Sequence, residues 1–212
     1  MIALLMSLLV MLGALQQNSL RAPQRLPAEG PLVTDGATPI IENERVTVWD
    51  LSWTKGIPAA MDRRTRNAIW VYLSPVPGQV VFWAAGAERT PPSLPGRAIV
   101  IELKAGRVAP LLNTSGYPNA FPREGSVKKI DNDQIVTWHH TWTPGKPSPV
   151  HFHDKDVVVV YLKSGTLKST TPDGQVSSNQ LTPGLTRFNP RDRVHTETLV
   201  EGESQAIITE LK

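Results

Sequence analysis

The feature that most constrains the fold of this chain is an internal repeat. The segment 43–58 returns 89 residues later as the segment 132–147, with two tryptophans at the same spacing in each copy. The same offset pairs residues 71–73 with residues 160–162, which read Val-Tyr-Leu in both places. A chain that repeats itself in this way is expected to fold as two copies of one structural unit.

A second match sets the lengths of the two copies. Residues 98–104 align with residues 206–212 at an offset of 108, so the second copy carries 19 more residues between these anchors. We place copy one at residues 39–104 and copy two at residues 126–212. Residues 105–125, which contain several prolines and glycines, are expected to be the linker between them.

Both copies are predicted to consist of β-strands. Residues 46–53 and 135–142 are rich in β-branched and aromatic residues and precede a turn with glycine and proline. In copy two, the Pro-Asp-Gly turn at 172–174 separates two further strands. The chain has 19 prolines and 15 glycines, which suits many short strands, and no helical period is evident after the N-terminal segment. The predicted fold class is therefore all-β, a β-barrel or jelly roll in two tandem copies.

The N-terminal residues predict export. Residues 2–15 are almost entirely apolar, which matches the hydrophobic region of a signal peptide and falls short of the roughly 20 residues of a membrane span. We expect a signal peptide over residues 1–22 and an extended arm over residues 23–38, which places the protein in the periplasm or outside the cell. Because Arg21 is the first positive residue, an uncleaved membrane anchor or a buried N-terminal segment is the alternative.

Charge and cysteine content exclude several classes of function. The net charge of +3 is too small for a surface that follows a phosphate backbone, so no nucleic-acid partner is expected. The chain contains no cysteine, which excludes disulfides, thiol nucleophiles and cysteine-ligated metal sites.

The histidines point to a metal site. All five lie in copy two, at positions 139, 140, 151, 153 and 195. His151 and His153 are two residues apart, so on a strand both imidazoles point to one face. If His195 on a later strand points into the same interior, three imidazoles converge. Such a set suits a divalent metal, Fe, Mn, Ni or Zn, with coordination positions left open for water or substrate.

These histidines lie in two motifs that resemble a known family. The segment 145–165, with the pattern G-x5-H-F-H-x4-V-x6-G, resembles the first motif of the cupin superfamily, and the segment 190–195 resembles the second. The two-copy layout resembles a bicupin with a degenerate N-terminal copy. The resemblance implies a jelly-roll β-barrel that holds a metal inside copy two through His151, His153 and His195.

Three positions depart from the family pattern. Val158 stands at the glutamate ligand of the first motif, Asp192 at a glycine of the second, and Leu199 at an asparagine. We therefore expect a set of three histidines, as in cupins resembling thiol dioxygenases, with Asp154 or Asp156 as an alternative oxygen ligand. Neutral imidazoles leave the charge of the metal ion uncompensated, which favours anionic substrates and lowers the pKa of bound water.

Other residues are weaker candidates. His140 shares a strand face with two tryptophans, so we expect a packed histidine or a neighbour of the metal site. Tyr161 and Arg187 are candidates for orienting a substrate, with a structural role as the alternative. Copy one has Asp62 and Arg64 in place of the two motif histidines. It is expected to bind no metal, and instead to cover copy two or to form the face of a homodimer.

Three classes of function follow. The first is an exported metal-dependent oxygenase or isomerase that acts on a small polar or anionic substrate. The second is an exported barrel that binds a small molecule, a sugar or an acid, without catalysis, and a structural module without ligand is a third. Cupin barrels host many chemistries, so the fold does not choose among them.

Overall fold

The computed structural model describes residues 39–54, 65–87, 94–104 and 106–212, and within them the chain forms fourteen β-strands and no helix. The predicted all-β fold class is confirmed. No helix in these ranges is therefore long and apolar enough to cross a membrane. The predicted signal peptide and arm lie outside the described residues, as do Asp62 and Arg64.

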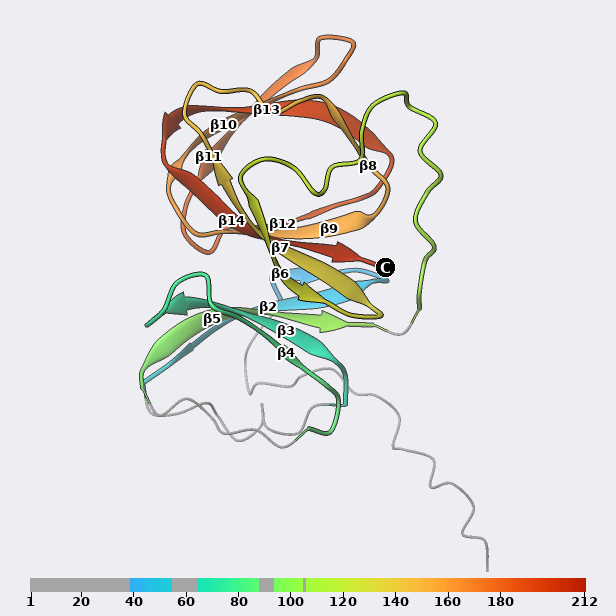
Figure 1. Ribbon diagram of the computed structural model, residues 1–212. Helices are drawn as coiled ribbons and strands as arrows, with labels where there is room; N and C mark the ends of the chain where they lie inside the picture. Colours follow the sequence, from blue (N-terminus) through green and yellow to red (C-terminus); the bar gives the residue numbers. More distant parts are fainter. Residues whose placement is uncertain (1–38, 55–64, 88–93, 105) are drawn as a thin grey trace, which may run out of the picture.

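Copy one forms one five-stranded antiparallel sheet in its described residues. The spatial order of the strands is β1-β2-β5-β3-β4, which places β5 in the centre of the lower sheet in Figure 1. The strands are β1 (Ile41–Glu42), β2 (Val46–Trp53), β3 (Ala68–Ser74), β4 (Val80–Trp83) and β5 (Gly96–Leu103).

Copy two forms two sheets that face each other as a jelly roll. A five-stranded sheet has the order β12-β9-β14-β7-β6, and a four-stranded sheet has the order β11-β10-β13-β8. The strands are β6 (Ser126–Asp131), β7 (Ile135–Trp142), β8 (His151–His153), β9 (Asp156–Tyr161), β10 (Gly165–Thr170), β11 (Val176–Leu181), β12 (Thr186–Asn189), β13 (Arg193–Gly202) and β14 (Ser204–Leu211). Their inner faces share an apolar core that includes Trp142, Tyr161, Leu167, Leu199 and Ile208.

The two five-stranded sheets are copies of each other. The strands β1-β2-β5-β3-β4 occupy the same order as β6-β7-β14-β9-β12, and the central strand pairs keep the same register under the two sequence offsets. Even individual hydrogen bonds recur. Trp49 donates its indole N–H to Glu102 at 3.2 Å, and Trp138 donates to Glu210 at 2.8 Å. The repeat found in the sequence is therefore a repeat of structure.

The additional residues of copy two build its second sheet. Residues 75–79 join β3 to β4 in copy one, whereas residues 162–185 join β9 to β12 in copy two and contain the hairpin β10–β11. This hairpin carries the predicted Pro-Asp-Gly turn. It pairs with β13, which pairs with β8. The sheet that carries His151, His153 and His195 thus has no counterpart among the described residues of copy one.

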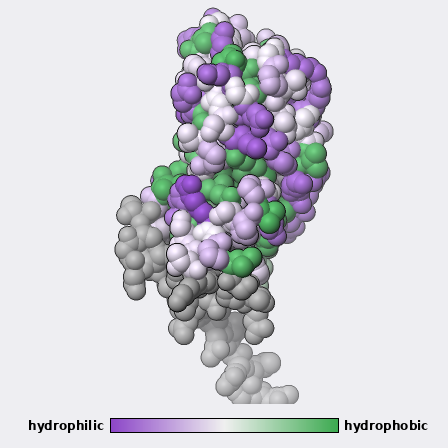
Figure 2. All heavy atoms as spheres, turned by 90° about the vertical axis from the view of Figure 1, so that its left-hand side faces the viewer, coloured by the Kyte–Doolittle hydropathy of each residue, from purple (hydrophilic) through white to green (hydrophobic). Residues whose placement is uncertain are grey.

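Copy one covers the outer face of the five-stranded sheet of copy two. One apolar core combines side chains of both sheets because alternate residues of each strand point toward the other copy. Its fully buried members include Val46, Ile69, Ile101, Val158, Val160 and Ile207. On the face in Figure 2, hydrophobic residues gather where the two copies meet. Copy one therefore fills the covering role considered for it from the sequence.

The contacts beside this shared core are reciprocal. Arg45 of copy one donates to Asp156 of copy two at 2.9 Å. The equivalent positions with the copies exchanged are Gln134 and Asn67, and Asn67 donates to Gln134. Contacts that recur with exchanged roles are typical of a two-fold interface between identical subunits. Within one chain, the two sheets therefore pack as two subunits of a homodimer would.

The segment that joins the copies, residues 106–125, also completes copy two. Phe152 on β8 donates its backbone N–H to Pro118 and accepts a hydrogen bond from the N–H of Ala120, both at 2.8 Å. Leu111 donates to the carbonyl of Asp154 at 2.8 Å. The segment thus rises from copy one and lies along β8 (Figure 1). This course brings its last residues to the interior of the barrel.

Candidate metal centre

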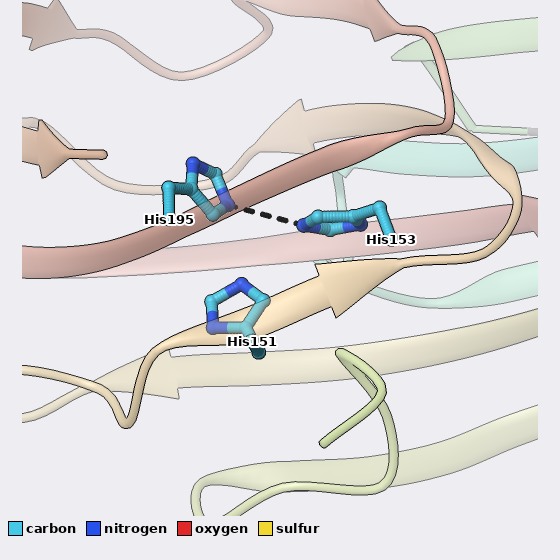
Figure 3. A group of neighbouring side chains, drawn as sticks. All are labelled: His151, His153 and His195. Carbon is cyan, nitrogen blue, oxygen red and sulfur yellow. Dashed lines mark hydrogen bonds between the residues drawn. The ribbon is translucent and has the colours of Figure 1, made fainter. Parts of the chain in front are cut away.

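Three histidines from two strands converge inside copy two. His151 and His153 lie on β8, and His195 on β13 stands opposite His151 in antiparallel register. All three are buried, and one ligand nitrogen from each lies within 4.8 Å of the others. Figure 3 shows the three imidazoles facing a common space. The structure thus brings together the three residues that the motifs singled out.

Burial keeps these imidazoles neutral at neutral pH. Removal from water lowers the pKa of His151 to about 3 and the pKa of His195 to about 4. The same cause holds the pKa of His153 well below its ordinary value. A neutral imidazole keeps a lone pair for a metal ion, so the donor set does not have to lose protons on binding.

Hydrogen bonds orient two of the rings. The Nδ1 of His151 lies 2.8 Å from the carbonyl oxygen of Pro149, so it carries the proton and leaves the lone pair on Nε2. The Nδ1 of His195 lies 2.9 Å from the hydroxyl of Ser169, which accepts or donates. The Nδ1 of His153 is buried and has no hydrogen-bond partner in the described part of the chain.

The separation of the nitrogens suits metal ligands. The Nε2 atoms of His153 and His195 are 3.1 Å apart, and one ring donates a hydrogen bond to the other in this structure (Figure 3). Two nitrogens that each lie about 2.1 Å from one metal ion, at roughly a right angle, are about 3.0 Å apart. The residues present therefore fit a divalent metal ion held by three imidazoles, with its remaining positions open to water or substrate.

Comparison with curated proteins finds one relative. The Beta-alanine degradation protein BauB of Pseudomonas aeruginosa is 37% identical over 60 residues, which are 28% of this chain and 59% of that protein. The chain thus matches about three fifths of the length of this relative. No protein-family model matches the sequence.

Comparison with solved structures finds cupin proteins. A cupin domain from Bordetella pertussis Tohama I is 28% identical over 44% of this chain and 99% of its own, with a TM-score of 0.38. A cupin 2 conserved barrel domain protein from Leptotrichia buccalis is 15% identical over 83% of this chain and 88% of its own, with a TM-score of 0.49. In this chain, the histidines of both motifs meet inside a jelly roll. Copy two is thus similar to these cupin domains.

The structure corrects the position of the absent glutamate. The motif pattern puts the glutamate of the cupin domain at Val158, but this side chain belongs to the core shared with copy one and faces away from the histidines. Its neighbours Val157 and Val159 point into the barrel. Since all three are valine, none of these three positions on β9 offers a carboxylate to the metal position.

The two aspartates considered as alternative ligands are engaged elsewhere. Asp156 accepts hydrogen bonds from Arg45 at 2.9 Å and from the backbone N–H of Arg191 at 2.9 Å. Asp154 is paired with Lys155 at 2.7 Å. Within the described residues, the metal-ligand cluster contains the three histidines alone. The structure thus favours the three-histidine alternative over an aspartate ligand.

Arg123 and Glu197 form a buried ion pair beside this cluster. Glu197 follows His195 by two residues on β13, so both point into the barrel. Arg123, at the end of the joining segment, donates to Glu197 at 2.8 Å, and Trp142 donates to the same oxygen at 3.2 Å. Burial opposes ionisation of Glu197, but the Arg123 guanidinium outweighs it and holds the pKa below its ordinary value. Neither residue belongs to a cupin motif, so sequence reasoning missed both.

The three weaker candidates from the sequence, His140, Tyr161 and Arg187, lie outside the histidine cluster. His140 faces the barrel interior, where its Nδ1 lies 2.8 Å from the hydroxyl of Ser126 and its ring meets Trp142 edge to face. Tyr161 is buried in the inner core, which raises the pKa of its hydroxyl. Arg187 is half-buried on β12 and donates to Asn179 at 2.6 Å. Within the described residues, none of the three is a member of the histidine cluster.

The free energy of unfolding of the metal-free chain is expected to fall as the pH drops from about 6.5 to about 3. Burial lowers the pKa of His140 to about 3, below the roughly 6.5 of an unfolded histidine. Between these values the unfolded chain binds more protons, so acid favours unfolding. Denaturant titrations at pH 7.5, 6.0 and 4.5 measure the slope. In the His140→Gln variant, the free energy of unfolding should fall less steeply with decreasing pH. An unchanged slope would contradict the lowered pKa of His140.

Proposed function

We propose that this chain is an exported metal-dependent cupin enzyme that acts on a small anionic substrate by oxygenase or isomerase chemistry. His151, His153 and His195 would hold the ion, which is Fe, Mn, Ni or Zn. The observation that carries the proposal is the convergence of three buried, neutral imidazoles with nitrogens at ligand spacing. Export rests on the apolar run of residues 2–15.

The bound ion would supply a Lewis acid with open coordination positions. The side chains around the metal position determine which molecules can reach the ion. Apolar side chains of the inner core, among them Tyr161 and Leu199, exclude bulk water. The cationic Arg123 and Arg193 border the histidines, at 2.7 Å from His151 and 3.2 Å from His195. Positive charge around a neutral ligand set favours an anion.

The name of the relative found by sequence supports a small substrate that carries a carboxylate. This relative is named for the degradation of β-alanine, a small molecule with a carboxylate. The aligned region covers 28% of this chain, so this support extends to the class of substrate and leaves the substrate itself to experiment.

Metal content tests the proposal. The purified chain, after reconstitution with Fe, Mn, Ni and Zn in separate samples, is expected to retain about one ion per chain of at least one metal. The His151→Ala/His153→Ala variant should retain almost none, because one imidazole does not hold a divalent ion against dialysis. Elemental mass spectrometry measures both. Equal metal content in the two proteins would contradict the site.

A non-catalytic binding barrel is the second candidate. The valines that occupy the glutamate region of the first motif favour it, because a reduced ligand set is compatible with loss of catalysis. Thermal shift assays with small acids and sugars separate the two functions. Stabilisation by a ligand without turnover in the metal-loaded protein would support the second.

A further inference from the structure

Arg123 is a buried cation, and some of its N–H donors have no hydrogen-bond acceptor among the described residues. Its side chain is 8% exposed, its Nη2 donates to Glu197, and it lies over the ring of Phe121 at 4.9 Å. Its Nε is buried and has no hydrogen-bond partner in the described residues. Its Nη1 lies 2.7 Å from the Nε2 and 3.1 Å from the Nδ1 of His151. The guanidinium is thus fixed on one side and faces the histidine cluster on the other.

No acceptor lone pair of His151 lies in line with the Nη1 of Arg123. This Nη1 is nearly as close to the Nδ1 of His151 as to the Nε2, so it lies against the imidazole ring and not on the outward axis of the Nε2 lone pair. An imidazole has one nitrogen that carries a proton and one with a lone pair. The Nδ1 of His151 donates to the carbonyl of Pro149, so the lone pair is on Nε2. When Nε2 binds a metal ion, His151 offers Arg123 no acceptor. A buried guanidinium with donors unmet is costly, so this position calls for a new acceptor.

Glu197 does not fill this role. Both Arg123 and Trp142 donate to the same Oε2 of Glu197. Glu197 is also outside the ligand cluster. It instead orients the guanidinium and balances one positive charge. A metal ion beside Arg123 would add positive charge that Glu197 does not balance, which favours an anion that contacts both cations.

We propose that Arg123, oriented by Glu197, binds the carboxylate of the substrate, which bridges the guanidinium and the metal ion. This inference rests on the proposed metal site and specifies its substrate class as small carboxylates. A carboxylate accepts hydrogen bonds from a guanidinium with matching planar geometry. Arg123 also lines a pocket of about 90 Å³ with His140, Trp142 and Lys146, which gives a small ligand access to the guanidinium. The three histidines of the cluster do not line this pocket, so the metal position lies beyond it.

The test uses the full chain loaded with Co(II), whose visible spectrum reports ligand exchange. Acetate is titrated, with acetamide as its uncharged counterpart, into the parent protein and into Arg123→Gln/Glu197→Gln. This double variant neutralises both partners, so it leaves no unpaired buried charge. The matched control is Arg45→Gln/Asp156→Asn, which neutralises another buried pair between the two copies. We expect acetate to bind the parent and the control, and to bind the Arg123 double variant roughly tenfold or more weakly.

The cobalt content of each protein separates two kinds of failure. The double variant is expected to retain cobalt as the parent does, because the three histidines are intact. A parent that retains no cobalt or other divalent metal would contradict the proposed function, and this inference with it. A parent that retains cobalt but binds acetate no better than acetamide, or as weakly as the double variant, would contradict the inference alone.

Discussion

A fragment of residues 106–212 is expected to self-associate, although it contains the whole of copy two with its two sheets. Removal of copy one uncovers the outer face of the five-stranded sheet, where Val158, Val160 and Ile207 are fully buried in the intact chain. Exposure of such a continuous apolar face to water is unfavourable, so the fragment should cover it with a second copy.

The geometry favours a dimer over irregular aggregation. Because the two sheets of the intact chain are copies packed around an approximate two-fold axis, a second fragment can occupy the place of copy one. Light scattering on a size-exclusion column measures the mass. The same fragment with Val160→Glu, which puts a charge in the face, should shift toward monomer or unfold. A monodisperse monomer of the unaltered fragment at tens of micromolar would contradict the prediction.

Arg45→Ala is expected to destabilise the chain by about 3–5 kcal/mol. The side chains of Arg45 and Asp156 are 9% and 11% exposed, and they pair at 2.9 Å. Removal of the arginine leaves the carboxylate without its counter-ion in a site that water hardly reaches. The cost comes from this unpaired charge more than from the lost attraction. Denaturant unfolding of the variant and the parent at pH 7.5 measures the difference.

The chain contains its own control for this pair. At the equivalent position, with the copies exchanged, Asn67 donates to Gln134 without any charge. Arg45→Gln/Asp156→Asn reproduces this uncharged pair and should change the free energy of unfolding by less than about 1 kcal/mol. If the double variant is as unstable as Arg45→Ala, the packing of the arginine stem and not the charge would explain the loss.

The repeat carried most of the information about the fold. The two offsets predicted which strands correspond, and the strand registers follow them. The two-residue spacing of His151 and His153 sufficed to place both rings on one face, because a strand alternates strictly. His195 was found through its motif, and it stands opposite His151 on the neighbouring strand.

The remainder of the site depends on contacts between distant parts of the chain. Arg123 lies in a segment that looked like a linker, and only its pairing along β8 carries it to the histidines. Ser169 and Glu197 are ordinary residues on strands, and no spacing marks them. The orientation of Val158 was also hidden, because a short run of valines reads the same on both faces.

The reciprocal packing of the two copies has a consequence for the behaviour of the protein on dilution. A homodimer with the same interface would separate as its concentration falls, and the face behind its histidine cluster would then meet water. Here the joining segment 106–125 holds the second sheet at a high effective concentration whatever the amount of protein in solution. Copy two thus keeps the sheet that covers its outer face even when the protein is scarce.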